Sequence, residues 1–129
     1  MMSVSTIIAV GSGGFLGAVF RMLLVGWVNK LFPHALPLGT LIVNISGSFM
    51  LGLLFGFFYC SNYFSPLTKT FLTTGFLGAM TTYSTFALES FFLLHGGSIW
   101  FGVINIFLNV FATILFAGAG YLLMVKLLS

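Results

Sequence analysis

The sequence has very little charge. Only 4% of its 129 residues are charged, namely Arg21, Lys30, Lys69, Lys126 and Glu89. A soluble domain usually has about a quarter charged residues, so this chain lacks the material for a water-facing surface. A single carboxylate side chain and the absence of any nucleophile with a nearby base also leave no catalytic constellation, and we predict no enzyme.

Cysteine is also scarce, and the basic residues are not clustered. Cys60 is the single cysteine, so neither an internal disulfide nor a thiolate metal site can form, and a small apolar filler is its expected role. Scattered basic residues argue against nucleic acid as a partner and favour membrane lipid headgroups. His34 and His95 fall in predicted loops or at their edges, where we expect them to be solvated.

What the chain has in abundance is apolar residues, which make up 60% of it. Because a membrane-spanning helix needs roughly 20 mostly apolar residues, the sequence predicts an all-α integral membrane protein with four transmembrane helices in one domain, residues 1–129. The first segment is as long as a span and has no Lys or Arg before it, so we expect it to stay in the membrane rather than be cleaved. The predicted spans are Thr6–Val28, Leu38–Cys60, Leu67–Leu94 and Ile99–Lys126.

The few basic residues are balanced between the two sides of the membrane. An even number of spans places Lys69 and Lys126 on one side, and Lys30 on the other with Arg21 near it. Orientation is normally set by an excess of Lys and Arg on the cytoplasmic side. Two against two gives almost no excess, which allows insertion in both orientations and an antiparallel homodimer.

Three spans carry small or polar residues at four-residue intervals, which places them on one helix face. Close helix packing explains the glycines and alanines of these stripes. Amides at membrane depth more often face a bundle interior or a water-filled route, so Asn44, Asn105 and Asn109 are candidates for lining one. The stripes are Ala9, Gly13, Gly17 and Arg21; Thr40, Asn44, Ser48, Gly52 and Gly56; and Asn105, Asn109, Thr113, Ala117 and Tyr121.

The third span has an unusual centre. Two glycines and a run of hydroxyl residues between Gly75 and Thr85 are unfavourable for a continuous helix in lipid. Broken spans are tolerated where protein or a watery cavity surrounds them, and they often build ion sites. We predict a break near Gly78 to Thr82, the alternative being an intact helix with hydroxyls bonded one turn back. For Arg21 and Glu89 we expect structural roles, such as anchoring a helix end.

Two stretches of this chain resemble the signatures of the Fluc, or CrcB-type, bacterial fluoride channels. These are Gly39-Thr-Leu-Ile-Val-Asn44 with Gly47 after it, and Thr74-Gly-Phe-Leu-Gly78-Ala-Met-Thr81-Thr-Tyr83-Ser-Thr-Phe86. Gly17 to Arg21 is similar as well, and the likeness in length, spans and charge balance covers the whole chain. The resemblance implies an antiparallel dual-topology homodimer in the bacterial inner membrane, with two fluoride pores at its interface that protect the cytoplasm from fluoride.

The resemblance also implies residue roles. Asn44 would donate an amide hydrogen to fluoride, Phe86 would present its ring edge, and Tyr83 would take the other phenylalanine position. Ser84 and Thr85 would add hydroxyls, while Gly78 and Thr81 would give carbonyls to a structural sodium ion shared by both subunits. Polar side chains of spans two and four would complete the fluoride pore, namely Thr40, Asn105, Asn109 and Thr113. The chain departs from the family pattern at Tyr83, where Phe is usual, and at Ala79, where Gly is usual.

Other interpretations remain open. Small dual-topology multidrug exporters also have four short spans, but their common feature is a glutamate in the first span, which this chain lacks. A proton-coupled fluoride exchanger would need a titratable carrier, and only Glu89 could serve. A purely structural membrane subunit would leave Asn44, Ser84 and Thr85 with no reason to be polar together.

Overall fold

A computed structural model describes residues 2–129, and these form helices joined by short connections, with no strand among them. The first two helices are α1 (Val4–Leu31) and α2 (Leu38–Cys60). The next segment is divided into α3 (Pro66–Thr70), the π-helical η1 (Phe71–Leu77), α4 (Gly78–Met80) and α5 (Tyr83–His95). The last comprises α6 (Ile99–Phe107), the π-helical η2 (Leu108–Ala112) and α7 (Thr113–Leu128).

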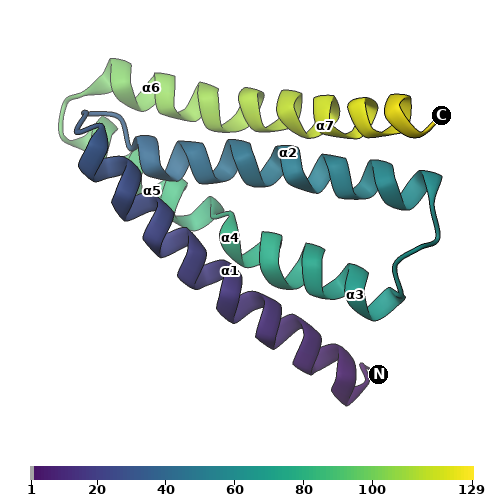
Figure 1. Cartoon of the computed structure of the whole chain (residues 1–129). Coiled ribbons are helices and arrows are strands. Elements are labelled where there is room, and N and C mark those ends of the chain that lie inside the picture. The colour runs from purple at the N-terminus through teal and green to yellow at the C-terminus, as the bar shows by residue number, and fades with distance from the viewer. Residues whose placement is uncertain (1) are drawn as a thin grey trace.

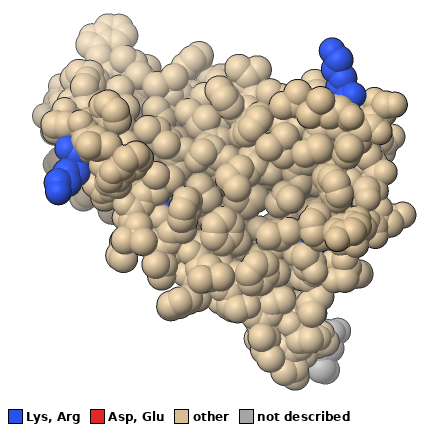
Figure 2. All heavy atoms as spheres, in the orientation of Figure 1, with Lys and Arg blue, Asp and Glu red and all other residues tan. Residues whose placement is uncertain are grey.

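The arrangement is that of a multi-pass membrane protein. Within the described residues, three helices are long and apolar enough to cross a bilayer, namely Val4–Leu31, Leu38–Cys60 and the continuous Ile99–Leu128. Both termini and the α2–α3 connection lie at one end of the molecule, and the other two connections lie at the opposite end (Figure 1). The face drawn in Figure 2 is formed almost wholly by uncharged residues, as a lipid-exposed surface requires.

Local sequence signals account for the helix ends. Ser3 and Ser65 each precede a helix, and their hydroxyls accept from the backbone N–H groups of Thr6 and Thr68, both at 3.2 Å. Such serine caps satisfy N–H groups that have no partner inside the helix. Pro66 follows in the first turn of α3, where its missing N–H costs nothing. Gly97, at φ 85°, makes the tight turn between α5 and α6.

Glycine allows two pairs of helices to touch backbone to backbone. A Cβ on Gly17 of α1 would collide with the carbonyl oxygen of Phe76 in η1, and one on Gly120 of α7 would collide with that of Phe49 in α2. In a bilayer, such contacts replace the hydrophobic driving force that lipid cannot supply. The two pairs diverge from one another (Figure 1), and α5 lies against α6.

The third segment changes direction between α4 and α5. Thr81 (φ −83°, ψ 156°) and Thr82 (φ −148°, ψ 116°) have extended backbone, so the helical ladder stops at Met80 and starts again at Tyr83. Thr82 caps α5, because its Oγ1 accepts from the backbone N–H of Thr85 at 3.3 Å. The two extended residues lie half way along the segment, next to the polar face of α2.

The glycine contacts predict unequal effects of two neighbouring substitutions in α7. Gly120→Ala should lower the stability of the protein in detergent by about 1–3 kcal/mol, the usual cost of overpacking. Gly118→Ala is the matched control, because no atom outside its own stretch of helix lies within 4 Å of a Cβ there and Ala is favoured over Gly in a helix. Thermal unfolding of both variants measures the difference, and equal midpoints would contradict the close α2–α7 contact.

Candidate functional site

The Asn44 side chain binds the extended backbone at Thr82 with both ends of its amide. Its Oδ1 accepts from the Thr82 N–H at 2.8 Å, and its Nδ2 donates to the Thr82 carbonyl at 3.0 Å. Both residues are buried. Unpaired backbone groups inside a membrane cost several kcal/mol, so the amide supplies the partners that the interrupted helix cannot.

A chain of hydrogen bonds continues from Asn44 into the last span. Its Nδ2 also donates to Asn109 Oδ1 at 2.9 Å, and Asn109 Nδ2 donates to the Oδ1 and backbone carbonyl of Asn105, both at 3.1 Å. Asn105 Nδ2 donates to Ser90 Oγ at 2.9 Å, and that hydroxyl donates to the Phe86 carbonyl at 2.8 Å. This series of hydrogen bonds thus starts at the N–H of Thr82 and ends at the Phe86 carbonyl in α5. Both hydrogens of the Asn44 amide are used in it, one to Thr82 and one to Asn109.

A cavity of about 300 Å³ opens beside this chain, between α2, the extended residues, α5 and the last span. Tyr83 and Phe86 lie on one side of it with ring centroids 5.4 Å apart at 74°, so that the edge of one ring faces the other. Tyr83 is 78% exposed, which leaves the cavity open on that side. The other lining residues are Asn44, Ser48, Thr81, Thr82, Asn109, Val110, Thr113 and Ile114.

The structure therefore brings five of the predicted pore residues to one cavity and leaves four outside it. Asn44, Tyr83, Phe86, Asn109 and Thr113 line it. Ser84 and Thr85 are exposed at the start of α5, where the Thr82 and Thr85 hydroxyls bond at 3.0 Å. Thr40 and Asn105 are buried and turned to other partners.

Sequence reasoning did not single out Thr82 or Ser90 as site residues. Thr82 supplies the backbone that Asn44 binds, and the buried Ser90 holds Asn105 in place. Ser90 lies one turn after Phe86 and bonds back to its carbonyl, a local pattern that many serines show in helices. Its part in the chain depends on the last span, which the sequence around it does not reveal.

Arg21 and the two residues predicted to bind sodium lie together at the break. Arg21 Nη1 donates to the Thr81 carbonyl at 3.3 Å. The Thr82 N–H binds Asn44, so the carbonyl of Gly78 loses the donor that an unbroken helix would place four residues later. A carbonyl oxygen can accept two hydrogen bonds, so the Thr81 carbonyl can take one further partner in addition to Arg21. Freed carbonyls of this kind are the oxygen ligands that hard cations use.

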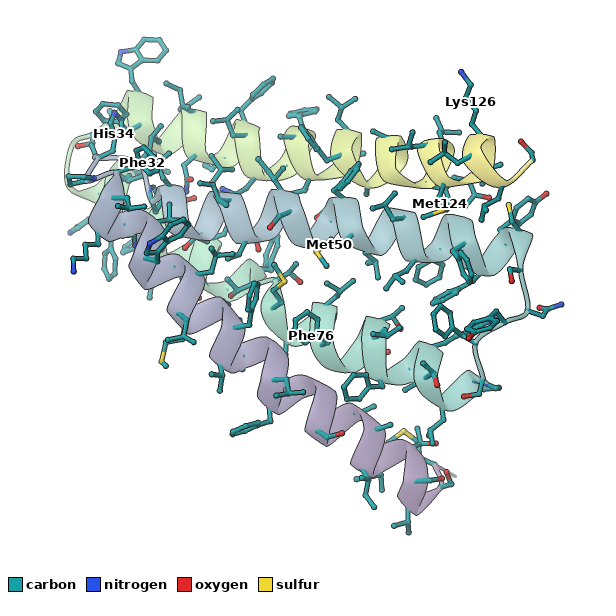
Figure 3. The ribbon with its side chains drawn as sticks, viewed as in Figure 1. Phe32, His34, Met50, Phe76, Met124 and Lys126 are labelled. Carbon is teal, nitrogen blue, oxygen red and sulfur yellow. The ribbon has the colours of Figure 1, made fainter. Side chains whose placement is uncertain are left out.

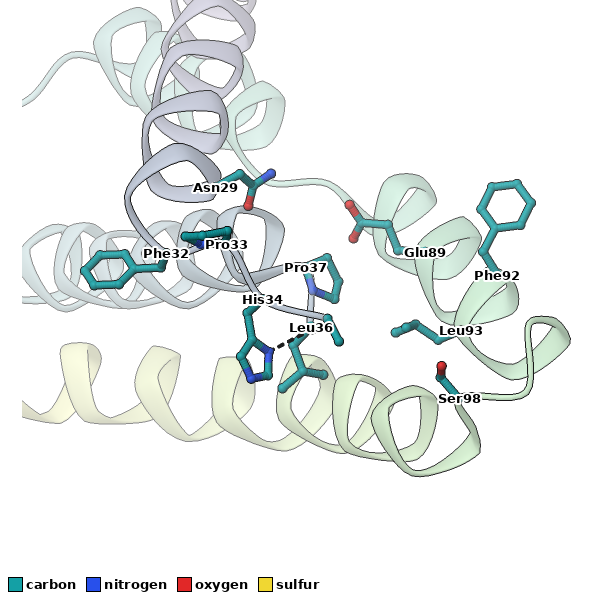
Figure 4. Close-up of a pocket in the computed structure, with 11 residues that line it drawn as sticks. Asn29, Phe32, Pro33, His34, Leu36, Pro37, Glu89, Phe92, Leu93 and Ser98 are labelled. Carbon is teal, nitrogen blue, oxygen red and sulfur yellow. Dashed lines mark hydrogen bonds between the residues drawn. The ribbon is translucent and has the colours of Figure 1, made fainter.

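Glu89 lies in a second cavity, at the end formed by the α1–α2 and α5–α6 connections. This cavity of about 520 Å³ is lined by residues that include Asn29, His34 and Ser98 (Figure 4). Glu89 Oε1 accepts from the Thr40 hydroxyl at 2.7 Å, and its buried Oε2 has no hydrogen-bond partner within the described chain. His34 Nδ1 accepts from the Leu36 N–H at 3.0 Å, which orders the loop over the cavity.

A helical membrane protein with an amide-lined cavity beside a broken helix has the features of a membrane transport protein. A family model described as "CrcB-like protein, Camphor Resistance (CrcB)" matches residues 8–121. The chain therefore belongs to the CrcB family.

Relatives in this family share nearly the whole chain. A protein of Sulfurimonas denitrificans is 53% identical over 120 residues, which is 93% of each chain. One of Campylobacter jejuni subsp. jejuni is 48% identical over 92% of this chain and 97% of its own, and one of Nautilia profundicola is 44% identical over 93% and 94%. Each of the three is named "Fluoride-specific ion channel FluC".

The two hydrogen bonds between the Asn44 side chain and the Thr82 backbone predict the effect of Asn44→Asp. The carboxylate can still accept from the Thr82 N–H, but the Thr82 carbonyl and Asn109 Oδ1 lose their donor. We expect a loss of about 1–3 kcal/mol of stability for each acceptor left unpaired. Asn62→Asp, in the exposed α2–α3 loop, is the control with the same change in chemistry. Equal unfolding midpoints of the two variants would contradict this account of the break.

Proposed function

We propose that this protein is a fluoride-selective channel, which lets fluoride leave the cytoplasm passively and so lowers its toxicity. Membership of the CrcB family and the names of the relatives support the ion. The observation that carries the mechanism is the open cavity of Asn44, Tyr83 and Phe86, placed where the third segment breaks. Passive flow needs a route and binding groups, and it needs no catalytic residue.

The cavity residues suit a small, tightly hydrated anion. A pore for fluoride must replace its water with donors, and amide hydrogens, hydroxyls and the positive edges of aromatic rings are the donors in this cavity. Both hydrogens of the Asn44 amide are engaged. We infer that fluoride takes the place of Asn109 Oδ1 as an acceptor, because Asn44 can then keep both of its bonds to Thr82.

Two copies of the chain are needed to complete the route. Tyr83, Ser84 and Thr85 form an exposed polar row at the start of α5, half way along a segment that crosses the membrane. Polar groups at that depth face protein or a water-filled cavity rather than lipid. A second copy in antiparallel orientation would cover this row and close the cavity into a pore. The balanced basic residues support such dual topology. We propose that the dimer lies in the inner membrane of a bacterium, because a channel that removes fluoride from the cytoplasm has to cross that membrane.

The position of Glu89 favours a channel over a proton-coupled exchanger. An exchanger needs a titratable group within the fluoride route, and Glu89 is the only carboxylate side chain. It lines the second cavity and binds Thr40, and it is not among the residues around Asn44 and Phe86. A multidrug exporter is disfavoured for the same reason, because the route contains no acid to bind a cationic drug.

Fluoride efflux from liposomes tests the proposed function. Protein reconstituted with internal fluoride, with charge build-up relieved by a potassium ionophore, should release fluoride rapidly and chloride hardly at all. Phe86→Ile should slow fluoride release by about tenfold or more, the change produced by about 1.4 kcal/mol of lost ion stabilisation. An ion-selective electrode records both anions.

The control for this assay is Phe15→Ile, which makes the same exchange at an exposed position on α1. It should release fluoride at the wild-type rate. Equal release of fluoride and chloride by the wild-type protein, or no release of either from a folded protein, would refute the fluoride channel.

We further propose a structural sodium ion held by the carbonyls of Gly78 and Thr81. The loss of the helical donor to Gly78 supports this assignment, because an unpaired carbonyl in the membrane requires another partner. When bound, the ion would accept oxygen ligands from these two carbonyls and so stabilise the backbone at the break. Arg21, which already donates to Thr81, would hold that carbonyl in place.

Sodium removal tests the site, because no side-chain substitution can delete a carbonyl. Protein dialysed into N-methylglucamine chloride should unfold at a lower temperature than protein in sodium chloride of the same ionic strength. A ligand present at 100 times its dissociation constant contributes about 2.7 kcal/mol. Titration with sodium should restore the midpoint while lithium or potassium at equal concentration should not, and identical midpoints in all salts would exclude the site.

A further inference from the structure

An apolar groove lies outside the fluoride route, between α2 and η1 and beside the α2–α3 connection. Its volume is about 370 Å³, and its walls include Met50, Leu54, Phe57, Leu72 and Phe76. Figure 3 shows Met50 and Phe76 facing one another across the gap where the two helices diverge. None of the lining residues has a polar side chain, so the groove offers water no partner.

The groove ends at an aromatic cluster with a lysine beside it. Phe64 of the α2–α3 loop packs on Phe57 and Phe58, with ring centroids 5.4 and 6.0 Å away. Lys69 Nζ lies 5.0 Å from the centroid of the Phe58 ring. The only carboxylate side chain in the chain, Glu89, lines the other cavity. The ammonium group therefore has no carboxylate side chain nearby to balance it.

We propose that this groove binds one acyl chain of an anionic phospholipid, whose headgroup is held by Lys69. An apolar gap in a bilayer loses dispersion contacts unless a hydrocarbon fills it, and the lipid tail is the hydrocarbon at hand. A Lys near the membrane surface attracts anionic headgroups by about 1 kcal/mol. The bound tail lies between α2 and η1, where the two helices diverge (Figure 3).

Charge favours a lipid over a second copy of this chain as the occupant. A second copy brings one acidic side chain, Glu89, which its own Thr40 already binds. That carboxylate is half-buried in a cavity of its own chain, which keeps it from the exposed face that a second copy would present to Lys69. An anionic phospholipid supplies both the tail for the groove and the charge for the lysine. This site does not depend on which ion the protein conducts.

Native mass spectrometry tests the site on the full-length protein. The protein is taken from nanodiscs of equal phosphatidylglycerol and phosphatidylethanolamine with identical acyl chains. We expect the wild type to retain phosphatidylglycerol in preference. Lys69→Gln should reduce that retention about fivefold, the loss that corresponds to one basic contact. Lys30→Gln, at the opposite end of the membrane segment, is the control and should retain it fully.

A second pair of variants tests the groove itself. Met50→Trp places a larger side chain in the groove and should abolish retention of both lipids. Met22→Trp makes the same exchange at an exposed position on α1 and should have no effect. Equal retention of both lipids by the wild type, or full retention by Lys69→Gln and Met50→Trp, would overturn the proposal. So would disulfide cross-linking of two copies through Met50→Cys in a Cys60→Ser background, because a second copy would then fill the groove.

Discussion

The rest of this fold depends on the pairing of the Asn44 amide with the backbone of the interrupted third segment. An extended pair of residues inside a membrane leaves backbone N–H and C=O groups without helical partners, and lipid cannot supply any. Asn44 binds both groups of Thr82, which lowers the free-energy cost of the interruption. Because the Thr82 N–H is bonded to Asn44, it is not available to the Gly78 carbonyl, which it would reach in an unbroken helix.

The glycine contacts determine where this constraint acts. Gly17 holds α1 against η1, and Gly120 holds α7 against α2. Each pair is a backbone contact that leaves little room for adjustment, so the position of Thr82 relative to Asn44 is set by two rigid helix pairs. The polar cavity lies where these pairs meet, and the apolar groove lies where they separate. The close glycine contacts within each helix pair therefore determine where the polar cavity and the apolar groove lie.

Part of this description follows from the sequence and part does not. The observed bounds of α2 are those predicted, and the four-residue stripes identify Asn44 and Asn109, because helical periodicity and hydropathy are local properties. The π-helical turns η1 and η2, the contact of Thr40 with Glu89, and the inclusion of Ser90 in the network were not predicted. These depend on side-chain directions between helices far apart in the sequence. The family resemblance gave a role to Asn44, but only the structure shows that both of its amide hydrogens are already bonded.

The hydrogen-bond chain from Thr82 to Phe86 has a direction. Each amide accepts from the member before it and donates to the member after it, so no single amide can be reversed without placing two donors or two acceptors face to face. The backbone groups at its two ends, the N–H of Thr82 and the carbonyl of Phe86, fix this direction, because the first can only donate and the second can only accept. Asn44, Asn109, Asn105 and Ser90 therefore act as one coupled group, because a substitution that removes one amide or hydroxyl also removes a hydrogen-bond partner from the next member.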